Sequence, residues 1–210
     1  MRTTTASIAS IAITLSLASA AAAQARTFNI ANDGGSRIQF ISDAPLETIT
    51  GVSSHVTGDV TFDAANLSST RGTVRVRVAT IRTGIDLRDE HLRAENWLDA
   101  NRYPDATFEI TGVEGASNLQ PNVSTRVRVR GRFSIHGVTR DIVANAQVRL
   151  IPLNDELRAA RIEGDVLRVQ ASFNIMLTDY NVSVPAIVRL KVANEIRVNV
   201  TIRGVARPAS

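Results

Sequence analysis

The sequence contains no cysteine, which excludes disulfide bonds, thiolate metal sites, cysteine nucleophiles and a lipid-modified N-terminal cysteine. Aromatic residues are also scarce, at 4% of the chain, with one tryptophan and two tyrosines. Lys191 is the only lysine, so arginine carries almost all of the positive charge. A chain of this length can bury a core large enough to fold without covalent links.

Recognisable catalytic motifs are absent as well. There is no G-x-S-x-G nucleophile elbow, no Walker loop and no G-x-G-x-x-G fingerprint. The carboxylates are scattered, with no pair that suggests acid–base catalysis. His55, His91 and His136 lie far apart, and none belongs to an H-x-H or H-E-x-x-H metal pair. The sequence therefore indicates neither an enzyme nor a metal site.

The size and charge of the chain suit one domain with an ordinary surface. It has 210 residues, of which 44% are hydrophobic. The formal net charge is +4, and removal of a leader that contains Arg2 as its one charged residue leaves +3. A basic balance can indicate nucleic acid, anionic lipid or an acidic partner. Because the excess is small and spread along the chain, we expect a solvated basic surface and no nucleic-acid partner.

The first 25 residues have the composition of an export signal. Arg2 is followed by an apolar run over residues 8–18 and then by small residues. Two A-x-A sites, at residues 21–23 and 23–25, suit cleavage. The run is short for a membrane span, which takes about 20 apolar residues, although an uncleaved anchor is the alternative. We predict a signal peptide over residues 1–25 and one domain over residues 26–210.

Beyond residue 26, apolar and polar residues mostly alternate. A period of two gives each strand one apolar and one polar face. Polar segments that interrupt it, such as residues 32–35, 63–71 and 115–121, predict turns and loops. The alternating apolar positions are Val74, Val76, Val78, Val127, Val129, Phe133, Ile135, Ile142, Ala144, Ala146, Val148, Leu150, Leu167, Val169, Ala171, Phe173, Ile175, Ile196, Val198, Val200 and Ile202. Many such strands predict an antiparallel sandwich or barrel.

Residues 86–98 (DLRDEHLRAENWL) depart from this period. Their apolar residues do not alternate, and their composition suits a helix with Asp86 as the N-cap. Asp89 and Glu90 would then lie in the first turn, where the helix dipole favours negative charge. A single helix in an all-β chain often covers one end of a barrel, so we predict a short helical insert here.

The alternation is compatible with two opposite barrels. In a soluble barrel the aliphatic face points inward, whereas in an outer-membrane barrel it meets lipid and the arginine face lines the interior. The aromatic residues are too few for two interfacial girdles, and a helical insert has no natural place in a small membrane barrel, so we favour the soluble arrangement. Small inward residues such as Gly131 then favour a ligand cavity, although they also allow tight closure.

Several sequence motifs follow one another in a distinctive order and spacing. The densest block comprises residues 88–92 (RDEHL), 97–99 (WLD) and 103–108 (YPDATF). Further blocks comprise residues 56–63 (VTGDVTFD), 131–139 (GRFSIHGVT) and 173–181 (FNIMLTDYN). In this order and spacing they resemble the signature of the YceI-like family. Together they span about residues 27–203, which is nearly all of the predicted domain.

The resemblance implies an all-β fold: an antiparallel, lipocalin-like, extended β-barrel with a short helical insert, located in the periplasm. It also implies that the barrel channel binds a long apolar lipid, either a polyisoprenoid, an isoprenoid quinone or its precursor, or a fatty acid or amide. Leu177 stands where the family usually has arginine, and Asn181 where it has glycine. Because asparagine accepts a left-handed backbone better than most residues, we expect the turn at Asn181 to persist.

The resemblance and the alternation together suggest which residues line the lipid channel. They are Val76, Val78, Leu92, Trp97, Phe108, Ile110, Val129, Phe133, Ile135, Phe173 and Ile175. Arg88, Asp89 and His91 are candidates for contact with the lipid head group at the barrel mouth. The alternative, which we favour, is that Arg88 and Asp89 pair to hold the insert and that His91 is hydrogen-bonded in a packed site. We expect His136 to occupy a hairpin turn next to Gly137.

These expectations describe a binding protein whose partner is a small lipid and which needs no catalytic residue, metal or other cofactor. Transient contact with a membrane and a homodimer are further options. The main alternative is a stress-response or interaction module with a filled barrel and no lipid. A third hypothesis is an enzyme acting on an isoprenoid quinone, for which Arg88, Asp89 and His91 would have to form the polar cluster.

Overall fold

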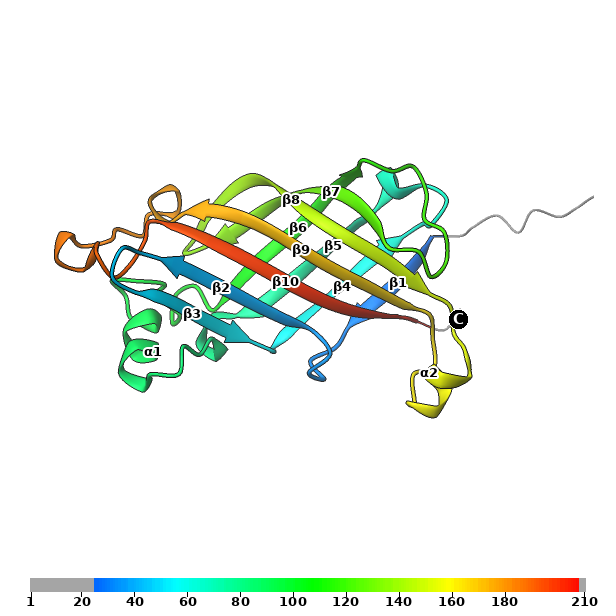
Figure 1. Ribbon diagram of the computed structural model, residues 1–210, viewed down its shortest axis with the longest axis horizontal. Helices are drawn as coiled ribbons and strands as arrows, with labels where there is room; N and C mark the ends of the chain where they lie inside the picture. Colours follow the sequence, from blue (N-terminus) through cyan, green and yellow to red (C-terminus); the bar gives the residue numbers. More distant parts are fainter. Residues whose placement is uncertain (1–24, 208–210) are drawn as a thin grey trace, which may run out of the picture.

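The computed structural model describes residues 25–207, so the predicted signal peptide lies outside the described residues except for Ala25. Antiparallel strands make up most of the regular structure (Figure 1). The strands are β1 (Arg26–Ile30), β2 (Arg37–Asp43), β3 (Thr48–Ser53), β4 (Val56–Phe62), β5 (Arg71–Arg77), β6 (Asp105–Glu114), β7 (Thr125–Ile135), β8 (Val138–Ile151), β9 (Val166–Met176) and β10 (Glu195–Ala206). The helices are α1 (Asp86–Arg93) and α2 (Asp155–Ala159), with 3-10 turns η1 (Leu67–Ser69), η2 (Val78–Thr80), η3 (Leu177–Tyr180) and η4 (Ala186–Val188).

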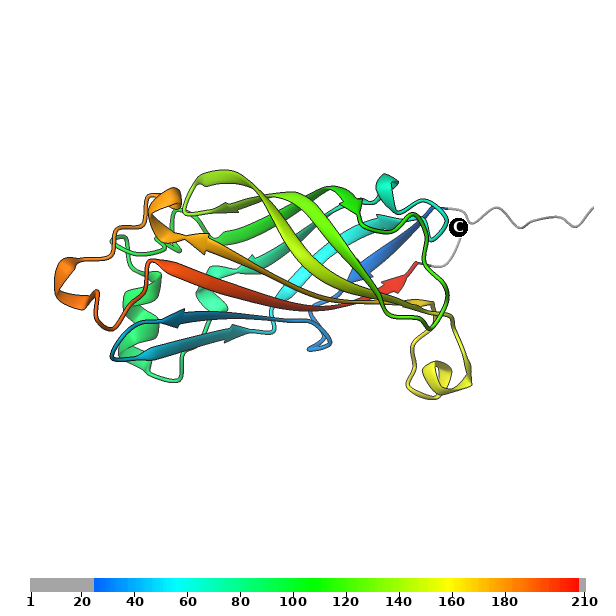
Figure 2. The same cartoon turned by 45° about the horizontal axis from the view of Figure 1, so that its top comes forward.

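The strands close into a barrel. Their order is β1-β4-β5-β6-β7-β8-β9-β10, and β10 pairs back with β1 at Ala206 and Phe28. The hairpin of β2 and β3 extends the barrel at one end, where β2 pairs with the first half of β10 and Val52 of β3 bridges to Arg82. The result is the elongated barrel of Figure 2. The predicted antiparallel, extended barrel is confirmed.

The apolar face of each strand points into the barrel. Along β8, for example, Ala144, Ala146, Val148 and Leu150 are buried and the residues between them are exposed. The arginines of β7 lie on the outer surface, where Arg132 pairs with Glu109 of β6 at 2.7 Å and Arg128 with Glu114 at 3.1 Å. Such exposed pairs contribute little stability each. The structure therefore has the inward-facing aliphatic arrangement that we favoured.

The predicted helical insert is present but shorter than expected. Helix α1 ends at Arg93, and Ala94 already has an extended backbone, so Trp97 and Leu98 lie in the turns that follow. The predicted N-cap was wrong, because Ile85 occupies the N-cap position and Asp86 begins the first turn. No helix within residues 25–207 is both long and apolar enough to cross a bilayer.

Two predicted turns are confirmed. His136 and Gly137 join β7 to β8 with positive φ angles of 52° and 74°, which a tight two-residue hairpin requires. The His136 ring lies 3.0 Å from the carbonyl oxygen of Tyr180 through Nδ1. Asn181 has a φ of 59°, so asparagine does adopt the left-handed backbone that follows η3. The hairpin and η3 are thereby fixed next to each other at one end of the barrel.

Candidate functional site

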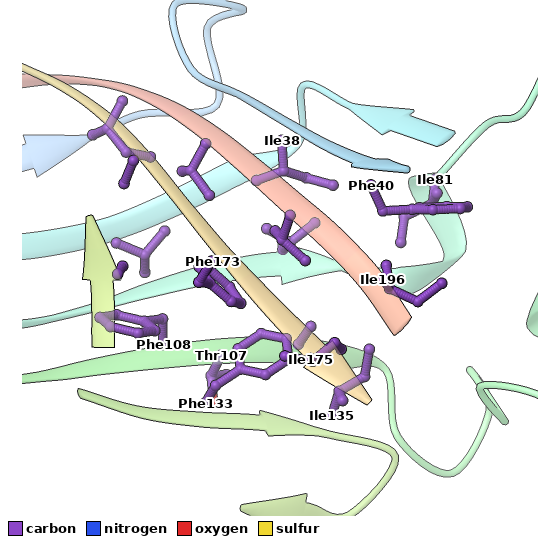
Figure 3. Close-up of a pocket in the computed structure, with 18 of the residues that line it drawn as sticks. Ile38, Phe40, Ile81, Thr107, Phe108, Phe133, Ile135, Phe173, Ile175 and Ile196 are labelled. Carbon is purple, nitrogen blue, oxygen red and sulfur yellow. The ribbon is translucent and has the colours of Figure 1, made fainter. Parts of the chain in front are cut away.

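An apolar cavity of about 520 Å³ lies inside the barrel (Figure 3). All ten strands contribute side chains to its wall. Its volume falls within the range of roughly 300–1,000 Å³ that is typical of small-molecule sites. The interior is therefore not filled by the protein's own side chains, which removes the structural basis of the filled-barrel alternative.

Small inward residues leave this space open. Ala106, Ala144 and Ala171 border the cavity, whereas Gly131 on β7 is buried and is not one of the lining residues. A Cβ at Gly131 would lie 2.5 Å from a ring carbon of Phe108, so glycine is required for this ring to pack against β7. Phe108 lies 6.0 Å, centroid to centroid, from Phe173. Phe133 also lies 5.3 Å from Phe173, so these three rings form one aromatic cluster on the wall.

The cavity opens at the end of the barrel that carries α1. Among the described residues, the lining side chains that are exposed are Ile85, Leu87, His91 and Lys191, all from α1 or the segments near it. The opposite end is closed by buried side chains, among them Phe28 and Phe62, whose rings meet edge to face at 5.9 Å. The cavity is thus a deep apolar pocket with one mouth.

Most of the residues predicted to line the channel do border this cavity. They are Val76, Leu92, Trp97, Phe108, Ile110, Val129, Phe133, Ile135, Phe173 and Ile175. Val78 does not, because β5 ends at Arg77 and the 3-10 turn η2 begins at Val78, so the period of two no longer applies. Its side chain is 1% exposed and belongs to the same buried apolar cluster as Leu98 and Tyr180.

Sequence reasoning missed the part of the wall that β1 to β4 supply. This part includes Phe28, Ile30, Ile38, Phe40, Ile49, Val60 and Phe62. A partial signal was available in residues 37–43 (RIQFISD), where Ile38 and Phe40 flank the polar Gln39, although the apolar Ile41 interrupts the alternation. Ile196, Val198, Val200 and Ile202 of β10, which were recognised as a strand face but not as site residues, also line the cavity.

The residues of the RDEHL block have three different environments at the mouth. Arg88 pairs with Glu47 of the β2–β3 turn at 2.6 Å, and its Nε donates to the Thr83 hydroxyl at 3.0 Å. Arg88 and His91 both border the cavity, and His91 is exposed. The predicted pairing of Arg88 with Asp89 was wrong, because the arginine reaches across to the neighbouring turn.

Asp89 does not border the cavity. It is 2% exposed, and one carboxylate oxygen accepts hydrogen bonds from the Thr83 amide at 2.7 Å and the Thr83 hydroxyl at 2.6 Å. Burial by itself raises the pKa of Asp89, but these hydrogen bonds, with Arg82 and Arg93 nearby, outweigh it and lower the pKa. Asp89 therefore fixes α1 to the preceding loop, so its candidate role as a head-group contact was wrong and it holds the insert through Thr83 instead of through Arg88.

The polar side chains of the cavity lie mainly at the mouth. Glu47, Thr83, Arg88, His91 and Lys191 are there, whereas the remaining wall is almost wholly aliphatic and aromatic. No group of three or more metal-ligating side chains occurs within residues 25–207. This arrangement can hold a long apolar chain inside the barrel while a polar end group stays near water and near the charges of the mouth.

Comparison with known proteins agrees with this architecture. The family model for the YceI-like domain matches residues 28–204. A UPF0312 protein of Vibrio cholerae is 32% identical over 90 residues, which are 43% of this chain and 44% of that protein. The aligned part of the chain thus spans less than half of that relative's length.

Two solved structures have a similar fold. Burkholderia cenocepacia BcnA matches with a TM-score of 0.65 at 18% identity, covering 83% of this chain and 98% of that one. A polyisoprenoid-binding domain from Saccharophagus degradans, implicated in plant cell wall breakdown, matches with a TM-score of 0.65 at 16% identity, covering 88% and 100%. At these identities the likeness concerns the fold.

Proposed function

Because the chain belongs to the YceI-like family, we propose that it binds a long apolar lipid inside the barrel and stores or carries it. The observation that supports this proposal most directly is the apolar cavity with one mouth at the α1 end. The similar Saccharophagus degradans domain, which binds polyisoprenoids, supports the same class of ligand. We therefore propose a polyisoprenoid, an isoprenoid quinone or its precursor, or a fatty acid or amide.

The driving force for such binding is the removal of apolar surface from water. Each methylene group buried contributes roughly 0.8 kcal/mol, so a chain of ten or more carbons can bind tightly without specific polar contacts. The aromatic side chains of Phe108, Phe133 and Phe173 add area to the middle of the wall (Figure 3). Shape and length, rather than hydrogen bonds, would then select the ligand inside the barrel.

We propose that the polar end of the lipid stays at the mouth near His91, Lys191 and Arg88. His91 and Lys191 are exposed and border the cavity, so both can reach a head group. Arg88 is already paired with Glu47, and it would contribute mainly by holding α1 against the β2–β3 turn.

The proposal describes a binding protein rather than an enzyme. The family and the almost wholly apolar wall support this assignment. We also propose that the protein acts in the periplasm, which rests on the apolar run over residues 8–18 and the A-x-A sites that follow it.

Native mass spectrometry with organic extraction tests this function. The full chain would be produced in a Gram-negative host and purified from the periplasmic fraction. We expect an apolar species of fixed mass to stay bound, and we expect the purified chain to begin near residue 26. An apo mass, together with no uptake of added polyprenols or fatty amides, would contradict the lipid-carrier function.

A further inference from the structure

Large apolar side chains are exposed around the mouth of the cavity. Ile187 is 92% exposed, Leu46 69%, Leu87 61%, Leu190 57% and Ile85 52%. They come from the β2–β3 turn, from the start of α1 and from the segment at η4. We call these five residues the mouth rim. Exposed apolar groups that gather in one place on a surface usually mark an interaction site.

The rim residues belong to one end of the molecule. The Leu46 amide donates to the Leu190 carbonyl at 2.8 Å, which joins the β2–β3 turn to the η4 segment. The ion pair between Arg88 and Glu47 joins α1 to the same turn. Figures 1 and 2 show α1, this turn and the loop before β10 at the same end of the barrel.

The rim is continuous with the cavity wall. Ile85 and Leu87 are exposed to water and also line the cavity, whereas Leu46, Ile187 and Leu190 lie outside it. An apolar path therefore leads from the outer surface into the barrel. A ligand chain that leaves the cavity passes directly over this rim.

Positive charge flanks the most exposed part of the rim. Arg189 and Lys191 lie on either side of Leu190, and both are exposed. Within the part of the chain that the structure describes, neither forms an ion pair. Apolar side chains beside unpaired cations are the combination that binds interfaces with anionic lipid, because the former enter the head-group region and the latter attract its charge.

We propose that the mouth rim docks on a bilayer surface that contains anionic phospholipid, so that the lipid passes between membrane and cavity without crossing water. This inference rests on the proposed function. A bilayer fits this surface better than a protein partner does, because the rim surrounds the opening of an apolar cavity. Only an apolar medium lets the ligand chain leave while its surface stays out of water.

Flotation with vesicles tests the docking surface. Vesicles of equal parts phosphatidylethanolamine and phosphatidylglycerol would be compared with vesicles of phosphatidylcholine. We expect the wild-type protein to bind the anionic vesicles. We expect the affinity of the triple variant Leu46→Ser, Ile187→Ser, Leu190→Ser for these vesicles to fall by about tenfold or more. The matched control is Val123→Ser with Val143→Ser, which removes apolar side chains that are 52% and 50% exposed but lie outside the rim.

The positive charge that flanks the mouth rim is tested separately. We expect Lys191→Gln to reduce the preference for anionic vesicles, and added salt to weaken binding of the wild-type protein by screening. Equal vesicle binding by the wild-type protein and the triple variant would overturn the docking surface. So would the absence of any vesicle binding by the wild-type protein.

Ligand uptake from detergent solution separates this inference from the proposed function. Trp97 is the only tryptophan and borders the cavity, so its fluorescence reports ligand in the barrel. We expect the triple variant to take up a polyprenol from detergent as the wild-type protein does, but to take it up more slowly from vesicles. Vesicle binding with no uptake by either route would leave the docking surface standing and contradict the lipid-binding function. Uptake from detergent without vesicle binding would support the lipid-binding function and contradict the docking surface.

Discussion

Filling the cavity from inside should abolish lipid binding while the barrel stays folded. Ala171 on β9 borders the cavity, and its cross-strand neighbours are Ala146 on β8 and Val200 on β10. The substitution Ala171→Phe would place an aromatic ring in the space that we assign to the ligand chain. Because this space is already present, we expect the apo protein to keep its thermal stability within a few degrees.

The size of the effect follows from the apolar contact that the ligand loses. The added ring has six carbons, and if it displaces about four to six chain carbons at roughly 0.8 kcal/mol each, the loss is about 3–5 kcal/mol. Since about 1.4 kcal/mol corresponds to a factor of ten, the affinity should fall by roughly 100-fold to 1,000-fold or more. A lipid that shifts toward the mouth to avoid the ring still exposes these carbons to water.

Titration of a polyprenol against Trp97 fluorescence measures this loss, with native mass spectrometry as an independent readout. Val143→Phe is the matched control, because Val143 is 50% exposed on the outer face of β8 and the same ring there leaves the cavity untouched. We expect wild-type affinity in this control. Wild-type affinity in folded Ala171→Phe would refute the assignment of the cavity as the lipid site.

Substitutions at three further positions test the framework around the site. Asp89→Asn removes the charge that accepts from Thr83, and it should lower the free energy of unfolding by about 1–3 kcal/mol, measured by urea denaturation. Since the pKa of Asp89 is lowered, its stabilising effect is present above the ordinary aspartate pKa and lost as the pH falls through the lowered value, so the wild type should lose this advantage over the variant in acid. Burial, with Asp179 nearby, raises the pKa of Tyr180 to about 12. An absorbance titration should therefore show one tyrosine that ionises at unusually high pH, and Tyr180→Phe should remove this transition. The contribution of Tyr180 to stability is present below its unfolded pKa and is lost as the pH rises toward 12. Asn181→Ala should lower the free energy of unfolding by about 1 kcal/mol and Asn181→Gly should barely change it, because the backbone at this position has a φ of 59°. Equal losses of stability in the two variants would show that the backbone conformation is not the cause.

The sequence determined the fold class, because a period of two is a local property of each strand. Alternation along β7, β8, β9 and β10 required one apolar and one polar face, and low aromatic content favoured the aliphatic face as the interior. The turn at His136 and Gly137 and the left-handed residue Asn181 could also be predicted, since both depend on backbone preferences of single residues. The motifs predicted the family and, through the family, the class of ligand that we propose.

Only the tertiary structure decided where the cavity opens and which polar residues reach it. Arg88 and Asp89 are adjacent in the sequence, but the first bonds to Glu47 across the mouth and the second is buried against Thr83. Val78 does not line the cavity, because a 3-10 turn begins where its strand ends. Alternation in the sequence does not reveal this turn. A backbone hydrogen bond between Leu46 and Leu190 brings two distant segments together in the mouth rim. Such features depend on strand register and long-range closure of the barrel, which no local pattern specifies.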